Sequence, residues 1–108
     1  MLVVYLAHKF NMEKWRVEEI RDFIVKAYQV RKDIVIINTP ILFGWSGISE
    51  KQAIKKSLKL LSLCDVVWVY VFSKTDFFTS KGLKKELRLA RMLHKPVKII
   101  TSVEDIKT

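Results

Sequence analysis

The segment 80–86 holds the residue types that bind anions and carry out acid–base or nucleophilic chemistry. Ser80 has the type and position of a helix N-cap, and Gly82 allows a ligand to approach the backbone closely. The free N–H groups of the first helical turn form an anion site. Glu86 follows later in the same helix, so its carboxyl group is expected over the helix start and partly toward the predicted sheet. A carboxyl group shielded from solvent there can act as a nucleophile, an acid or a base.

A structural role for Glu86 is the alternative. A glutamate near a helix N-terminus is favoured by the helix dipole and can simply pair with a neighbouring cation, here Lys81, Lys85 or Arg88. Such glutamates are usually solvated. The two roles differ in an observable way, because a catalytic Glu86 faces inward and an ion-paired one lies exposed.

The elements that position this segment follow from the hydrophobic pattern. Four short runs rich in β-branched residues show no alternation of apolar and polar positions, which predicts parallel strands covered on both faces: 2–6, 34–38, 66–72 and 97–101. Stretches with apolar residues at three- and four-residue steps alternate with them and predict helices: 13–31, 49–63 and 82–93. Ser49 and Gln52 have the spacing of a capping box. Ser102 and Asp105 have it too, and they predict a short helical turn in the tail.

The order of these elements predicts an α/β fold. Strands that alternate with helices imply right-handed crossovers, and we expect the strand order 2-1-3-4. The predicted architecture is a small doubly wound, flavodoxin- or Rossmann-like three-layer sandwich with a mainly parallel sheet of about four to five strands. At 108 residues the chain has room for one hydrophobic core, so a single domain spans residues 1–108.

This topology also predicts where a ligand binds. In an open parallel sheet, ligands bind outside the carboxyl ends of the strands where the strand order reverses, which here is between the first and third strands. Three segments reach that edge: 7–11, 38–47 and 73–82. They add four candidate binding residues to those in segment 80–86, namely His8, Asn11, Trp45 and Asp76.

Each of these candidates has a second possible role. His8 and Asn11 can contact a base or a phosphate, although a lone loop histidine is more often exposed to solvent. Trp45 can stack on a base, or pack against the following helix or a second subunit. Asp76 lies at the correct edge for acid–base work. Asp65 precedes the third strand and is therefore expected at the amino edge, in a capping or pairing role.

The composition limits the partners. Twenty Lys and Arg residues against eleven Asp and Glu give a net charge of +9, which favours anionic partners such as nucleotides or nucleic acid. The single Cys64 excludes an internal disulfide, and two distant histidines make no metal signature, so we expect neither a metal nor a cofactor. The N-terminus lacks the features of a signal peptide or membrane span, so a cytoplasmic protein without membrane contact is expected.

Four motifs occur in order along the chain: Tyr5-Leu6-Ala7, Leu63-Cys64-Asp65-Val66-Val67-Trp68-Val69, Ser80-x-Gly82-x-x-x-Glu86-Leu87-x-x-Ala90 and Lys95-Pro96-Val97. Together they resemble the nucleoside 2-deoxyribosyltransferase-like superfamily. The similarity is greatest to its short members and to the deoxynucleoside 5′-monophosphate N-glycosidase branch. The resemblance implies attack on a C1′–N-glycosidic bond by the two-step logic of retaining glycosidases.

The resemblance also implies roles for individual residues. Glu86 matches the nucleophilic glutamate of the family, and Tyr5 matches a tyrosine that lies by the sugar and the nucleophile. Ser80 replaces an aspartate of the true transferases and is similar to the monophosphate-hydrolysing branch, which together with Gly82 favours a phosphorylated ligand. Hydrolysis and transfer both stay open. A homodimer is expected, with part of the pocket supplied by the neighbouring subunit.

The rival function is that of a non-catalytic, basic dimer that binds nucleotides or nucleic acid. It predicts that the basic faces of the second and third helices join into one positive surface made of Lys51, Lys55, Lys56, Lys59, Lys84, Lys85, Arg88 and Arg91. It also predicts binding that weakens steeply with salt. We rank it second because the chain has no base-reading motif and no interleaved aromatic residues.

Overall fold

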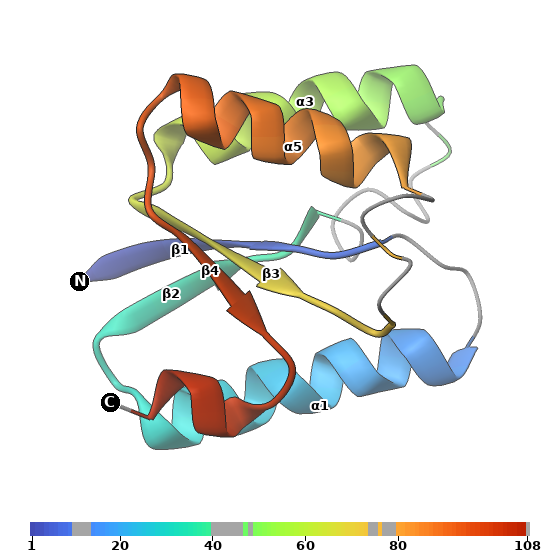
Figure 1. The fold of residues 1–108 in the computed structure, drawn as a ribbon. Helices are drawn as coiled ribbons and strands as arrows, with labels where there is room; N and C mark the ends of the chain where they lie inside the picture. The colour runs from blue at the N-terminus through green and yellow to red at the C-terminus, as the bar shows by residue number, and fades with distance from the viewer. Residues whose placement is uncertain (10–13, 40–46, 48, 74–75, 77–79, 108) are drawn as a thin grey trace.

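The protein is described by a computed structural model that covers residues 1–9, 14–39, 47, 49–73, 76 and 80–107. Its elements follow one another as β1 (Leu2–Ala7), α1 (Lys14–Val30), β2 (Ile34–Ile37), α3 (Glu50–Leu63), β3 (Val66–Tyr70), α5 (Lys81–Met92), β4 (Val97–Ile100) and the short 3-10 helix η1 (Val103–Ile106). The strands form a parallel sheet in the order β2-β1-β3-β4, which confirms the predicted fold class and strand order. Helices α3 and α5 cover one face of the sheet, and α1 with η1 covers the other (Figure 1).

Both faces of the sheet are buried, which explains why its strands read as continuous apolar runs. Side chains alternate between the two faces along β1. Val4 and Leu6 pack against α1 and η1, whereas Tyr5 and Ala7 lie under α3 and α5. The hydroxyl group of Tyr5 therefore lies in the core between the sheet and helices α3 and α5.

Serine residues begin the elements where the sequence predicts caps. The Ser49 hydroxyl accepts the Gln52 N–H at 3.1 Å at the start of α3. The Ser80 hydroxyl accepts the Leu83 N–H at 3.2 Å at the start of α5. A full capping box opens η1 between Ser102 and Asp105, as predicted from their spacing. These bonds satisfy N–H groups that have no partner within their own helix.

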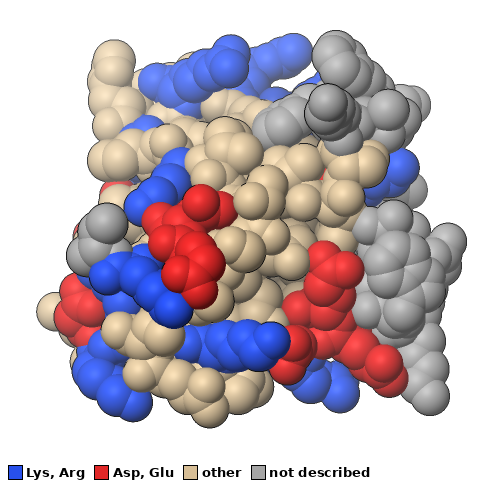
Figure 2. All heavy atoms as spheres, turned by 60° about the horizontal axis from the view of Figure 1, so that its bottom comes forward, with Lys and Arg blue, Asp and Glu red and all other residues tan. Residues whose placement is uncertain are grey.

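Charges of both signs alternate on the outer surface of the α1 and η1 layer. Two ion pairs occur there, Lys26–Asp22 at 3.0 Å and Lys107–Glu104 at 2.8 Å, and a third, Arg31–Asp33 at 2.6 Å, lies in the turn after α1. Figure 2 shows this side of the molecule, with acidic and basic side chains next to one another. No helix in the part of the chain that the structure describes is long and apolar enough to cross a membrane.

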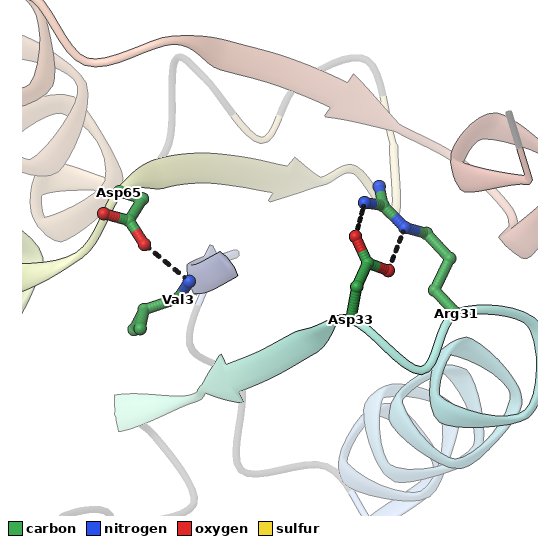
Figure 3. Close-up of polar contacts among 4 residues, drawn as sticks. All are labelled: Val3, Arg31, Asp33 and Asp65. Atoms are coloured by element: carbon green, nitrogen blue, oxygen red, sulfur yellow. Dashed lines mark hydrogen bonds and ion pairs between the residues drawn. The ribbon is translucent and has the colours of Figure 1, made fainter. Parts of the chain in front are cut away.

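Hydrogen bonds of polar side chains stabilise the turns at the amino edge of the sheet (Figure 3). Asp65 Oδ2 accepts the Val3 N–H at 2.7 Å, and the Asp65 N–H donates to the Val3 carbonyl oxygen at 2.8 Å. The Arg31 guanidinium binds both carboxylate oxygens of Asp33, at 3.0 and 2.6 Å, and lies 5.9 Å from the centre of the Trp68 ring. Asp65 thus has the structural role at the amino edge that its position predicts.

Candidate active site at Tyr5 and Glu86

A small polar cluster lies between the sheet and the α3–α5 layer, around the hydroxyl group of Tyr5. Tyr5 is fully buried, and its hydroxyl lies 3.2 Å from Thr39 Oγ1 just after β2. Ser57 from α3 and Glu86 from α5 also interact with this hydroxyl. We call these four residues the Tyr5 cluster. It joins three separate parts of the chain to β1 inside an otherwise apolar core.

Glu86 faces inward because of its place in the helical repeat. It lies between Leu83 and Ala90 at three- and four-residue steps, and both of those side chains are buried against the sheet. Glu86 as a whole is half-buried, but its Oε2 atom is enclosed and has no hydrogen-bond partner among the described residues. The neighbouring cations Lys85 and Arg88 are exposed instead. The inward orientation is the one that a catalytic glutamate requires.

Burial sets the protonation state of Glu86. It raises the pKa of the carboxyl group to about 8, while the hydrogen bond with Tyr5 acts in the opposite direction. At pH 7 Glu86 is therefore mostly neutral. Burial and the nearby Glu86 also raise the pKa of Tyr5, so its phenol stays protonated and can donate a hydrogen bond.

His8 is buried just beyond β1, with both of its ring nitrogens bonded within the protein. Asn38 Nδ2 lies 2.9 Å from His8 Nε2, and His8 Nδ1 lies 3.0 Å from the Lys9 carbonyl oxygen. An amide N–H needs an acceptor and a carbonyl needs a donor, so the ring is neutral with its proton on Nδ1. Burial lowers the pKa of His8 in agreement with this state. A ligand could use His8 only by replacing one of these two bonds.

Asp76 organises the turn after β3. Its Oδ2 accepts the N–H groups of Phe72 at 2.7 Å and Ser73 at 3.3 Å, and its Oδ1 accepts the Ser73 hydroxyl at 3.2 Å. These bonds draw the backbone out of the strand, and they account for β3 ending at Tyr70 rather than at the predicted residue 72. The buried Asp76 carboxylate is therefore occupied by its own turn, and its predicted ligand contact stays a prediction.

The start of α5 has free space beside its backbone. A Cβ atom placed on Gly82 would meet no atom of the described residues within 4 Å, and the φ angle of Gly82 is not in the left-handed region. The absence of a side chain at Gly82 thus exposes the first turn of α5, which Ser80 caps. The other two candidates, Asn11 and Trp45, lie outside the described residues.

Three polar residues around the site were missed by the sequence analysis: Asn38, Thr39 and Ser57. Ser57 carried a usable signal, because it is a polar residue in the otherwise apolar stripe of its helix. Its hydroxyl donates to the Ala53 carbonyl oxygen at 2.7 Å and also interacts with the Tyr5 hydroxyl. The described residues contain no group of three or more His, Cys, Asp or Glu side chains that could hold a metal ion.

The comparisons with known proteins assign no family to this chain. No protein-family model matches it, and the search of curated proteins finds no match. The case for a function therefore depends on the Tyr5 cluster, the start of α5 and the distribution of charge.

Proposed function

We propose that the chain cleaves the N-glycosidic bond of a deoxynucleoside 5′-monophosphate, with Glu86 as the nucleophile. The proposal depends on one observation above all. A carboxyl oxygen of Glu86 is enclosed and has no hydrogen-bond partner within the described part of the chain, and it lies beside the neutral hydroxyl of Tyr5. Buried polar groups without partners are rare and costly, and they concentrate where a protein binds or reacts.

The environment of Glu86 suits a reaction in which positive charge develops. The transition state of glycosidic cleavage resembles an oxocarbenium ion, and a carboxylate in an apolar surrounding stabilises such a cation strongly. The same apolar surrounding keeps Glu86 mostly protonated in the free protein. Positive charge that develops at C1′ lowers the pKa of Glu86, so the ionised carboxylate is favoured as the transition state forms.

The reaction follows two steps. A Glu86 carboxylate oxygen forms a bond to C1′ as the C1′–N bond breaks, and the bonding electron pair leaves with the base, which takes a proton from solvent. Water then attacks C1′, which releases Glu86 as a carboxylate, the sugar phosphate and a proton. Because Oε2 is enclosed in this structure, substrate reaches it only after neighbouring side chains move aside.

Two features support a phosphorylated substrate. The first turn of α5 offers backbone N–H groups, and the space beside Gly82 lets a ligand approach them. The Glu86 carboxyl lies in the same helix about one turn further on, which matches the short separation between a 5′-phosphate and C1′ in one nucleotide. The high net positive charge attracts anionic substrates to the protein.

Base release tests this proposal directly. The protein is incubated with a panel of deoxynucleosides and their 5′-monophosphates, and free base is followed by chromatography. We expect release from one or more monophosphates and a loss of about 1,000-fold or more in Glu86→Gln, which keeps the shape of the protonated carboxyl. Glu18→Gln, at an exposed position on α1, is the matched control and keeps full activity. No release from any substrate, or an equally active Glu86→Gln, contradicts the proposal.

The pH dependence separates a nucleophile from an acid. A nucleophilic Glu86 must be ionised, so kcat/KM rises with pH and levels off above about 8. A profile that falls through this range would instead mean that Glu86 donates a proton, and the nucleophile assignment would be wrong.

A further inference from the structure

The charged side chains that the structure describes on the outer surface of α3 and α5 are all basic. The two helices lie side by side on the same face of the sheet (Figure 1). Each places four exposed cationic side chains on its outer side: Lys51, Lys55, Lys56 and Lys59 from α3, and Lys84, Lys85, Arg88 and Arg91 from α5. We call these eight residues the basic layer.

Among the described side chains, the basic layer lacks the acidic neighbours that cations have on the opposite side of the protein. The acidic side chain that α5 contributes, Glu86, faces the core. None of the described residues forms an ion pair with the basic layer, whereas the α1 and η1 side carries two ion pairs. The side of α1 and η1 is thus mixed in charge (Figure 2), whereas the described charges on the outer side of α3 and α5 have one sign. Such a separation of charge creates a strong positive potential on one side of the molecule.

We infer that the basic layer binds the phosphate backbone of double-stranded nucleic acid. Lysine ammonium groups held on two rigid helices bind phosphates as point charges, without reading the bases. Single strands are bound through aromatic side chains on which bases stack, and the outer faces of α3 and α5 present none in the described residues. A duplex is the better partner, because its phosphates are regularly spaced and its bases are stacked inside the helix.

A membrane surface fits the basic layer less well. Membrane-surface helices place apolar side chains on the face that enters the lipid. Leu63, Met92 and Leu93 are exposed, but they lie at the carboxyl-terminal ends of α3 and α5 rather than among the lysines. A second copy of the chain is disfavoured as the occupant of this surface, because two basic layers would repel each other.

Salt dependence and matched variants test the inference. Binding of a labelled duplex of about 20 base pairs is followed by fluorescence anisotropy between about 50 and 200 mM salt, with DNA and RNA duplexes in parallel. Contacts to about four to six phosphates give a slope of about −4 to −5 in log K against log salt. DNA and RNA duplexes are expected to bind within a few-fold of each other, because the contacts are to phosphates.

Charge-reversal pairs locate the surface. Lys55→Glu with Lys59→Glu on α3, and Lys84→Glu with Arg88→Glu on α5, are each expected to weaken binding about tenfold or more and to reduce the slope by about 2. The control pair, Arg21→Glu with Lys32→Glu, makes the same change in net charge at exposed positions of the opposite layer. It is expected to alter affinity less than about threefold. Circular dichroism checks folding, and glutamine at the same positions replaces any pair that fails to fold, with the same expected change in slope.

Three results would overturn the inference. The first is an equal loss of binding in the control pair, which would mean that only net charge matters. The second is tighter binding of single strands than of duplex. The third is binding to phosphatidylserine vesicles in the absence of duplex binding. The test is independent of the proposed catalysis, since Glu86→Gln leaves the basic layer intact and is expected to bind duplex as the unaltered protein does.

Discussion

Tyr5 in β1 and Glu86 in α5 are far apart in the sequence, but their side chains meet between the sheet and the α3–α5 layer. The phenol hydroxyl of Tyr5 forms a hydrogen bond with the carboxyl group of Glu86. The contact places a neutral hydrogen-bond donor beside a carboxyl group whose other oxygen has no partner in the described part of the chain. The chemical properties of the site follow from this pair, and the first two predictions each change one of the two residues.

The first prediction concerns stability and pH. The folded protein holds the Glu86 proton up to about pH 8, whereas the unfolded chain releases it near the ordinary value of 4.5. Glu86 therefore stabilises the fold at low pH, and this contribution is lost as pH rises through the interval, by at most about 1.4 kcal/mol per pH unit. Urea unfolding at about pH 5, 6.5 and 8 measures it as the difference between the unaltered protein and Glu86→Gln. Glu18→Gln should show no such difference, and a constant Glu86→Gln difference would contradict the burial of this carboxyl.

The second prediction concerns the Tyr5 hydroxyl. Tyr5→Phe removes the hydrogen bond that lowers the pKa of Glu86, so that pKa should move above about 8. The loss of the bond to Thr39 should cost about 1 kcal/mol of stability. Carbon NMR of labelled glutamate side chains measures the pKa directly, and base release at pH 7 should fall. Tyr70→Phe is the matched control, since Tyr70 packs against Phe23 on the α1 side, and it should leave the pKa of Glu86 unchanged.

The third prediction concerns His8. Its bonds to Asn38 and Lys9 require a neutral ring with the proton on Nδ1, which nitrogen chemical shifts can identify. Burial lowers the pKa of His8, so its titration midpoint should lie below 6.5. The stabilising contribution of the neutral ring is complete above 6.5 and is lost as pH falls through the lower, folded-state pKa. Asn38→Asp places a negative charge beside Nε2 and should raise the midpoint. A midpoint above 6.5 in the unaltered protein would show that the ring is not held in this way.

The fourth prediction concerns Gly82. Alanine fits there without a clash, and its helical preference should raise stability by about 0.5–1 kcal/mol. The added methyl group intrudes into the space beside the first turn of α5, so KM for a monophosphate should rise by about tenfold while KM for the free nucleoside stays the same. Thermal unfolding and steady-state kinetics measure the two effects. A stable Gly82→Ala variant with unchanged kinetics would exclude phosphate binding at this turn.

The sequence by itself predicted the helices, the strands and the serine caps of α3 and α5, because these depend on periodicity and on contacts between near neighbours. The strand order was predicted from the rules that govern strand–helix–strand crossovers. The element ends were less accurate, as at β3, where the side chain of Asp76 ends the strand from a position beyond it. The helical spacing of Glu86 from Leu83 and Ala90 pointed toward the sheet, but it did not show whether the carboxyl group is buried or paired with a neighbouring cation.

Tertiary structure decided which groups meet. It brought Thr39 and Ser57 to the Tyr5 hydroxyl, enclosed one oxygen of Glu86 and occupied both nitrogens of His8. It also placed α3 beside α5 (Figure 1), so that two helices with exposed cations lie on the same side of the sheet. None of this follows from local pattern, because burial and pKa depend on side chains that are distant in the chain and are brought together only by the packing of the helices on the sheet.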